Sequence, residues 1–157
     1  MARAGADLAM LLLGGFRFMA DEATERLTAR GHPGIRPAHD FALRAIEGGA
    51  SSVAEVGRRT SVSKQAAAKT IAAMQRLGYV EIEPDPGDGR RRRIRVTPRG
   101  RDMVAIGSAL FDDVRDRWAE RIGAQQLDAL QAHLGQLVMP RPLGAEDLTR
   151  DADADAQ

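Results

Sequence analysis

The chain has 157 residues, 43% of them hydrophobic, which is enough for one domain or one domain with a helical extension. It has no cysteine, and this excludes disulfides, thiolate metal ligands and a cysteine-based redox switch within the chain. The apolar run at residues 8–13 is too short to span a bilayer, and no clear cleavage site follows it. We therefore expect no membrane span, no signal peptide and a cytoplasmic location.

The net charge of +1 conceals an uneven distribution along the chain. Residues 58–101 carry twelve basic and four acidic side chains, a net charge of +8, whereas the remainder carries eleven basic and eighteen acidic side chains, a net charge of −7. A solvated surface is the more common origin of a charge run. Here the basic segment coincides with a groove-reading pattern, and the separation therefore favours a protein that presents one face to a polyanion.

Two helices are predicted before residue 50. Residues 8–30 repeat apolar side chains at helical spacing, although Gly14-Gly15 interrupts them at a cost of about 1 kcal/mol each relative to alanine. We expect these glycines to mark a close approach to another helix. His32-Pro33-Gly34 ends this helix. A second helix over residues 37–47 begins with proline and is followed by Gly48-Gly49, which is the usual asymmetry.

Residues 52–78 predict a helix-turn-helix. Ser52 and Glu55 form a capping box that opens a short helix to about residue 59. A turn over residues 60–62 leads to Ser63, the N-cap of a helix over residues 64–77, and Gly78 ends that helix. The apolar stripe of this second helix consists of Ala67, Thr70, Ile71, Met74 and Leu77.

A basic two-stranded ribbon, or wing, is predicted next. Residues 79–83 alternate as a strand, and residues 84–89 form a turn-rich loop. On the returning strand, residues 91–96, one face carries Arg92, Ile94 and Val96 and the other carries Arg91, Arg93 and Arg95. Thr97-Pro98 then caps a long helix to about residue 121, and residues 125–138 form a final helix. Residues 148–157 have the composition of a disordered acidic tail.

The expected fold class is mainly α: a winged helix-turn-helix with a two-stranded wing at residues 37–97, flanked by N- and C-terminal dimerisation helices at residues 8–30 and 98–138. Each flanking helix has an apolar stripe, but a winged helix of this size has little core with which to cover them all. We therefore expect these helices to pair with a second copy. An ordinary intrachain bundle is the alternative.

A helix of this kind fits the major groove of B-DNA, which is about 12 Å wide, and reads bases mainly through its N-terminal residues. Lysine donates to guanine, glutamine pairs with adenine, and the alanine methyl groups suit the thymine methyl. Simple phosphate attraction is the alternative for the lysines. The candidates for base edges are Lys64, Gln65, Ala66, Ala68 and Lys69, and those for phosphates are Thr60, Ser61 and Ser63.

The wing carries four consecutive arginines, and a narrow minor groove attracts an inserted arginine. We assign Arg90 to the groove, with Asp88 bracing its guanidinium, and Arg91 and Arg93 to phosphates.

The wing segment resembles a known family pattern. Asp88-Gly89-Arg90, followed by Ile94, Val96, Thr97 and Gly100, is similar to the D-x-R-x-x-x-V-x-L-T-x-x-G wing of the MarR-type (multiple antibiotic resistance regulator) family. Residues 63–80 resemble its recognition helix and the entry to its wing, and the resemblance extends over residues 8–137. The sequence departs from the pattern at Ala67 and Thr70, where the family usually has leucine and valine, and the lack of cysteine excludes its peroxide-sensing branch.

The resemblance implies a homodimeric transcriptional regulator, usually a repressor, that binds a pseudo-palindromic operator in double-stranded DNA. It also implies a small, often aromatic effector that enters the crevice between the dimerisation and DNA-binding parts and releases the DNA. By the same resemblance, Asp88 and Arg90 are the bracing pair and the minor-groove finger.

Other sites and functions have weaker support. An effector crevice lined by Phe16, Met19, His39, Phe41 and Trp118 is a hypothesis, since such an apolar stripe is more often plain core. The three histidines match no metal-ligand spacing, and we expect no metal and no cofactor. No nucleophile elbow, phosphate-binding loop or zinc-protease motif is present, so we expect no enzyme. The alternative function is a winged helix used for protein or RNA contacts, without an operator.

Overall fold

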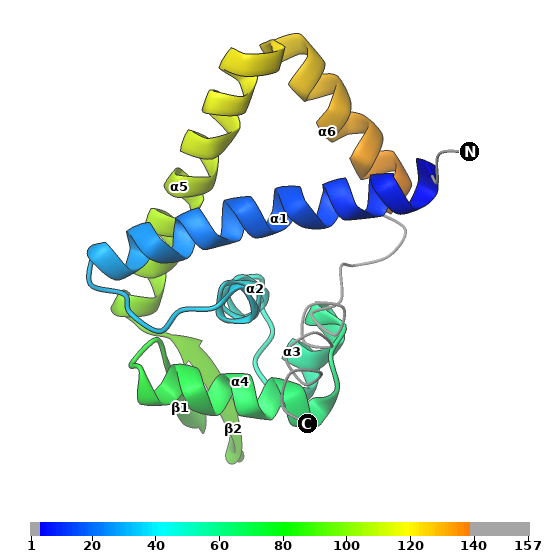
Figure 1. Cartoon of the computed structure of the whole chain (residues 1–157). Coiled ribbons are helices and arrows are strands. Elements are labelled where there is room, and N and C mark those ends of the chain that lie inside the picture. The colour runs from blue at the N-terminus through cyan, green and yellow to red at the C-terminus, as the bar shows by residue number, and fades with distance from the viewer. Residues whose placement is uncertain (1–3, 139–157) are drawn as a thin grey trace, which may run out of the picture.

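The computed structural model describes residues 4–138, and the predicted acidic tail at residues 148–157 lies outside them. Figure 1 shows the described elements. In chain order they are α1 (Ala4–Ala29), α2 (Pro37–Glu47), α3 (Val53–Thr60), α4 (Lys64–Arg76), β1 (Val80–Asp85), β2 (Asp88–Val96), α5 (Pro98–Ile122) and α6 (Ala124–Val138).

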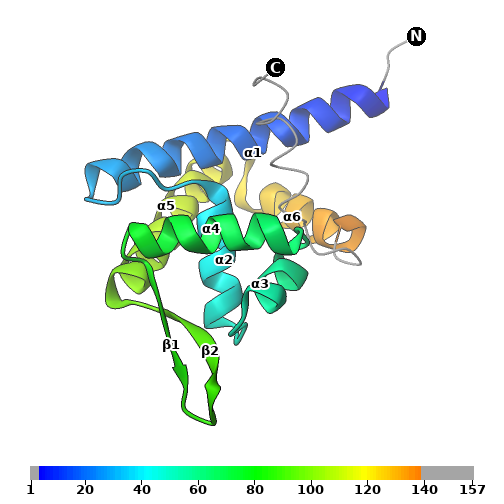
Figure 2. The same cartoon turned by 90° about the horizontal axis from the view of Figure 1, so that it is seen from below.

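The molecule has two parts. Helices α2, α3 and α4 and the antiparallel β1–β2 hairpin form a winged helix, and in Figure 2 the hairpin projects well beyond α4. The long helices α1, α5 and α6 lie on the other side of α2, with α1 crossing α5 and α6 folding back from the end of α5 (Figure 1). The expected fold class, mainly helical with a two-stranded wing, is confirmed.

One hydrophobic core joins the two parts. It begins on the C-terminal half of α1, includes the inner faces of α2, α3 and α4, and ends on the base of the wing and the first half of α5. Its largest fully buried side chains are Tyr79, Leu43, Met74, Met103 and Leu110. The winged helix is therefore packed directly on α1 and α5, rather than attached to them by a flexible linker.

The three helices of the winged helix end in the same way. After α2, α3 and α4, one residue has a positive φ, and the N–H of the residue that follows returns to a carbonyl of the last helical turn. The residues with positive φ are Gly49, Ser61 and Gly78. Ser61, with φ of 55°, is the one non-glycine of this kind among residues 4–138. This sharp end of α3 makes the turn of the helix-turn-helix.

The structure corrects two boundaries predicted from the sequence. Helix α1 begins at Ala4 rather than at residue 8, and it continues unbroken through Gly14 and Gly15. A Cβ on Gly15 would be in ordinary contact with the Trp118 ring of α5, at 3.5 Å, and one on Gly14 would meet nothing within 4 Å, so these glycines do not mark the close helix approach predicted for them. The strands extend further than predicted, and only a short turn separates Asp85 from Asp88. Pro84 is tolerated inside β1 because the hairpin has only two strands, and each is an edge strand.

Polar contacts tie the long helices together. The Arg26 guanidinium of α1 donates to the Asp113 carboxylate of α5 at 2.8 Å. Arg115 of α5 pairs with Asp128 of α6. No helix among the described residues is long and apolar enough to cross a membrane.

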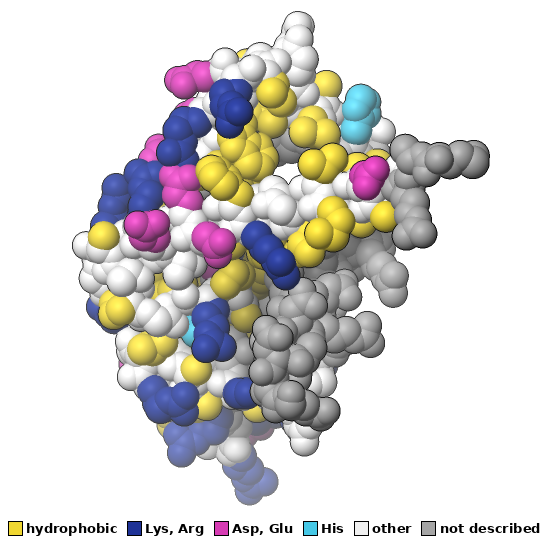
Figure 3. Space-filling view, viewed as in Figure 1, with side chains coloured by type: hydrophobic (Ala, Val, Ile, Leu, Met, Phe, Trp, Pro, Cys, Tyr) yellow, Lys and Arg dark blue, Asp and Glu magenta, His cyan; other side chains and the backbone are white. Residues whose placement is uncertain are grey.

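The outer surfaces of α1 and α6 remain apolar and uncovered. Figure 3 shows hydrophobic side chains gathered over the part of the molecule that α1, α5 and α6 form. We call the exposed apolar side chains of α1 and α6 the apolar flank: Leu8, Met10, Leu11, Leu12, Phe18, Leu130, Leu137 and Val138.

Candidate nucleic-acid interface

The turn between α3 and α4 is compact because its backbone approaches closely. The Val62 N–H donates to the Gly57 carbonyl at 2.9 Å, and a Cβ on Gly57 would lie 3.1 Å from the Val62 carbonyl. Ser63 then caps α4, accepting the Ala66 N–H at 3.1 Å, as predicted. The N-terminus of α4 is thus fixed against α3.

Helix α4 has one buried and one exposed face. Its inner face buries Ala67, Ile71 and Met74 against the core. The base-edge candidates lie on the other side: Lys64, Gln65, Ala68 and Lys69 are exposed, and Ala66 is half-buried. Lys64 and Lys69 are also the only lysines of the chain. The side chains that could contact base edges are therefore gathered on one accessible surface.

The three phosphate candidates differ in their accessibility. Ser63 is exposed and uses its oxygen as an acceptor for the cap, which leaves its hydroxyl proton available to donate. Ser61 is half-buried. Thr60 differs from the expectation, because it is buried and its hydroxyl donates to the Val56 carbonyl at 2.8 Å. Its side chain is held inside the helix-turn-helix, away from any backbone that α4 would approach.

The wing pairs its strands so that Val80 lies opposite Val96 and Ile82 opposite Ile94. Val80, Ile94 and Val96 are buried, and the Ile94 N–H donates to the Ser51 carbonyl at 2.8 Å. The base of the wing is thereby fixed to the loop before α3.

Carboxylates hold the backbone of the wing tip, residues 85–91. Asp85 accepts the Gly87 N–H at 2.8 Å, and Asp88 accepts the Arg90 N–H at 3.1 Å. The second oxygen of Asp88 lies 3.5 Å from Nε of Arg91. Asp88 therefore braces the backbone of Arg90, whereas the guanidinium beside it belongs to Arg91, which differs from the predicted contact with the Arg90 guanidinium.

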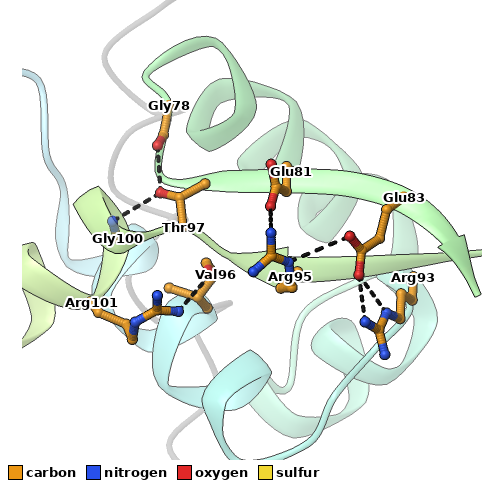
Figure 4. A network of polar contacts seen from close by, with 9 residues as sticks. All are labelled: Gly78, Glu81, Glu83, Arg93, Arg95, Val96, Thr97, Gly100 and Arg101. Atoms are coloured by element: carbon orange, nitrogen blue, oxygen red, sulfur yellow. Dashed lines mark hydrogen bonds and ion pairs between the residues drawn. The ribbon is translucent and has the colours of Figure 1, made fainter. Parts of the chain in front are cut away.

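The start of α5 locks the wing to the end of α4. The Thr97 hydroxyl donates to the Gly78 carbonyl at 2.6 Å and accepts the Gly100 N–H at 3.1 Å (Figure 4). Gly100 has no room for a side chain, since a Cβ there would lie 2.6 Å from Cγ1 of Val96 and closer still to the Tyr79 carbonyl. The glycine of the family pattern is thus explained by packing.

A polar cluster around the buried His32 and Tyr79 connects the same region to the loop after α1. The Tyr79 hydroxyl lies 3.2 Å from Nδ1 of His32, and Nε2 of His32 lies 3.0 Å from the Asp102 carboxylate. The Arg99 guanidinium stacks 4.9 Å from the centroid of the Tyr79 ring and donates to the Gly31 carbonyl at 2.9 Å. Burial raises the pKa of Tyr79, although Arg99 acts in the opposite direction. The cluster couples the end of α4 to the loop after α1 and to the start of α5.

The five residues proposed for the effector crevice lie on α1, α2 and α5. Phe16 and Met19 of α1, Phe41 of α2 and Trp118 of α5 are partly buried, and His39 is buried near the start of α2, where its Nδ1 accepts the Arg36 N–H at 3.1 Å. Burial, with the Arg36 charge, lowers the pKa of His39.

A small apolar cavity of about 20 Å³ does lie between α1, α2 and α5, but none of those five residues lines it. Beside this cavity is Asp40, whose Oδ1 is the only buried side-chain nitrogen or oxygen atom without a hydrogen-bond partner among residues 4–138. Its other oxygen accepts from Nε of Arg44 at 2.7 Å. The described residues contain no cluster of three or more His, Asp or Glu side chains that could hold a metal ion.

Two features of the wing were missed from the sequence. Glu83 and Glu81 of β1 pair with Arg93 and Arg95 of β2, and Arg92 has no such partner within the described part of the chain (Figure 4 shows the pairs). The signal was present in the sequence, because Glu81 and Glu83 flank an isoleucine in β1 as Arg93 and Arg95 do in β2. Only the strand register, which is not evident from the sequence, places them opposite each other.

A helix-turn-helix with an exposed polar face on its second helix and an arginine-rich wing defines the class of winged-helix proteins. Residues 34–91 match the model of the MarR family. The resemblance to that family is confirmed, and the matched segment extends from the loop before α2 to the wing tip. A comparison with curated protein sequences found no significant match.

Solved structures share this fold. A MarR-family transcriptional regulator from Rhodococcus sp. RHA1 is 17% identical, with a TM-score of 0.67 over 90% of this chain and 99% of that one. CouR from Rhodococcus jostii RHA1 bound to p-coumaroyl-CoA is 18% identical, with a TM-score of 0.66 over 90% and 98%. The S. aureus MepR F27L mutant bound to an oligodeoxyribonucleotide is 14% identical, with a TM-score of 0.57 over 83% and 94%. The chain has the fold of MarR-family transcriptional regulators.

Proposed function

We propose that the chain is a sequence-specific regulator of transcription that binds double-stranded DNA as a homodimer and has no enzymatic activity. The observation that carries the proposal is the exposed face of α4, which presents Lys64, Gln65 and Lys69 while the wing tip presents its arginines. The concentration of positive charge in residues 58–101 supports the same assignment.

In this proposal α4 enters the major groove, where Lys64, Gln65 and Lys69 contact base edges and the small Ala66 and Ala68 allow close approach. Ser61 and Ser63 bind phosphates at the N-terminus of the helix, where backbone N–H groups favour anions. Arg90 enters the adjacent minor groove, and Asp88 holds its backbone.

The apolar flank supports a dimer. Leu11 is 72% exposed and Leu137 is 77% exposed, so apolar side chains of both α1 and α6 lack cover within one chain. A second copy related by a two-fold axis would cover them and place the two α4 helices on successive half-sites, about one helical turn apart. The operator is then pseudo-palindromic.

We further propose repression in the cytoplasm, relieved by a small aromatic effector. MepR was solved with an oligodeoxyribonucleotide and CouR with p-coumaroyl-CoA, which supports both kinds of partner for this fold. The cavity between α1, α2 and α5 has a volume of about 20 Å³, room for no more than about one water molecule. An effector would therefore have to separate α2 from α1 and α5, a movement that would also displace the helix-turn-helix.

Selection of preferred sites from random duplexes, with the wild type and with Arg90→Ala, Lys64→Ala and Gln65→Ala, tests the DNA-binding assignment. We expect Arg90→Ala to weaken binding without loss of fold stability, and the two α4 variants to change base preference. A protein that is monomeric and binds no duplex in dilute buffer would contradict the proposal. Transcription in vitro from a promoter that overlaps the selected site, with and without aromatic acids, tests repression and release.

A further inference from the structure

The arginines of β2 have different electrostatic surroundings, although four of them are consecutive in the sequence. Their surroundings depend on the residue that lies opposite each of them in β1. Glu81 lies opposite Arg95, Glu83 opposite Arg93, and Pro84 opposite Arg92. The register therefore provides a carboxylate to Arg93 and Arg95 and withholds one from Arg92.

The two paired arginines share a continuous network. Oε1 of Glu83 accepts from Nε of Arg93 at 2.7 Å and from its Nη2 at 2.5 Å, while the second oxygen of Glu83 lies 3.5 Å from Nε of Arg95. Arg95 also pairs with Glu81 (Figure 4). Two arginines and two glutamates thus form a group with no net charge, and Glu83 lies between both arginines.

Arg92 is exposed and belongs to the last pair before the register shifts near the wing tip. Its side chain makes no ion pair with any other residue in the range 4–138, and its neighbours across and diagonally along β1 are Pro84 and Ile82, which carry no charge. Arg92 and Arg90 are therefore the wing arginines whose positive charge is uncompensated. Arg91 is intermediate, with a single contact of 3.5 Å to Asp88 and a side chain that is 80% exposed.

We propose that Arg92, rather than Arg93, makes the phosphate contact beside the groove arginine, and that Glu81 and Glu83 set the inner limit of the DNA contact on the wing. The proposal rests on the proposed function, since it specifies which side chains of the wing meet the DNA backbone.

Electrostatics favours this division. A phosphate that recruited Arg93 would break two contacts to Glu83 and leave that carboxylate facing the polyanion with only Arg95 nearby. Arg92 can approach a phosphate without breaking any contact. Opposite charges on paired strand positions also stabilise the hairpin, so the glutamates both hold the ribbon and withdraw two cations from the interface.

The salt dependence of binding counts the phosphates that the protein neutralises and so tests the proposal directly. The slope of log K against log salt concentration is negative. Its magnitude decreases by about 0.9 for each phosphate that is no longer neutralised, or by about 2 for a dimer in which each wing releases one phosphate. The experiment measures this slope by fluorescence anisotropy of one selected duplex between about 50 and 200 mM salt. The variants are Arg92→Ala, Arg93→Ala and Glu83→Gln. Arg121→Ala, an exposed arginine near the far end of α5, is the matched control for the removal of a charge.

We expect Arg92→Ala to reduce the magnitude of the slope by about 2. Arg93→Ala should leave the slope close to that of Arg121→Ala. Glu83→Gln keeps the shape of the side chain but frees Arg93, and should make the slope steeper. The inference is overturned if Arg93→Ala reduces the magnitude of the slope as much as Arg92→Ala does. It is also overturned if Arg92→Ala leaves the slope unchanged, or if Glu83→Gln does so. Failure of the wild type to bind any duplex would instead overturn the proposed function, and this inference with it.

Discussion

The winged helix and the outer ends of α1 and α6 differ in how their apolar side chains are covered. Leu43, Val56 and Met74 of the winged helix are completely buried within one chain, whereas Leu11 of α1 and Leu137 of α6 are about three-quarters exposed. The first region is covered within one chain, with α1 and α5 contributing to its core, whereas the second is covered only against another surface. Fold stability and assembly should therefore respond to different substitutions.

The largest effect should come from breaking the covered region at Gly100, where α5 packs against the base of the wing. In Gly100→Ala the new Cβ would overlap the Tyr79 carbonyl and Val96, and backbone on one side of the contact cannot move without opening the wing. We expect the free energy of unfolding to fall by about 3 kcal/mol or more, as for severe overpacking. Denaturant unfolding measures it.

Gly135→Ala in α6 is the matched control, because that position is also helical and has nothing within 4 Å of a new Cβ. Alanine there should stabilise the helix by up to about 1 kcal/mol. Equal stability of the two variants would contradict the assigned role of Gly100.

The second prediction breaks the region left uncovered in one chain and spares the covered one. The double substitution Leu8→Glu and Leu11→Glu would bury two unpaired carboxylates from each copy in a dimer interface. We expect the dissociation constant of the dimer to rise by about 100-fold or more, with the helical content of each chain retained. Sedimentation and far-UV circular dichroism measure the two quantities.

Thr28→Glu places a charge on an exposed position near the other end of α1, where the Thr28 hydroxyl bonds only to the Thr24 carbonyl. It should leave the dimer intact. If the double variant remained dimeric, another surface would have to form the interface.

The third prediction sharpens the comparison within the winged helix, at two serines of one turn. Ser61 has the left-handed backbone that glycine prefers, so Ser61→Gly should raise the free energy of unfolding by about 1 kcal/mol. Ser63→Ala removes the cap of α4 and should lower it by about 1 kcal/mol. Both variants should weaken DNA binding, since each removes a hydroxyl assigned to phosphate. Changes of stability with the same sign would contradict this account of the turn.

The smallest effect concerns pH. The pKa of His39 is lowered by burial and by Arg36, so the folded protein binds a proton less readily than the unfolded chain. The contribution of neutral His39 to the free energy of unfolding is therefore fully present above the unfolded pKa of about 6.5. It is lost progressively as the pH falls below that value.

His39→Gln removes the titrating group and keeps an acceptor at the third helical position for the Arg36 N–H. The difference in stability between wild type and variant should therefore change below about pH 6.5 and stay constant above it. A difference that is independent of pH would show that His39 does not titrate on unfolding.

The elements that local chemistry decides were predictable from the sequence. Pro37, Ser52, Ser63 and Thr97 start their helices where expected, and the apolar stripe of α4 is buried at Ala67, Ile71 and Met74. Those signals act within one turn of helix, so they need no knowledge of the fold.

The features that escaped prediction depend on contacts distant in sequence. Thr60 is an exception, because its hydroxyl is taken up by the Val56 carbonyl, only one helical turn away inside α3. The pairing of Arg93 with Glu83 depends on strand register, and the contact of His32 with Tyr79 joins residues 47 positions apart. Alternating charges in β1 and β2 were visible, but no local rule states which pairs will meet.

The position of the two lysines has a practical consequence. Every other basic side chain of the chain that carries a permanent charge is a guanidinium, so a reagent selective for primary amines would modify, among side chains, only the outer face of α4. Mass spectrometry of such adducts would map contact of that one surface with a bound macromolecule in the unaltered protein, residue by residue and without any introduced tag.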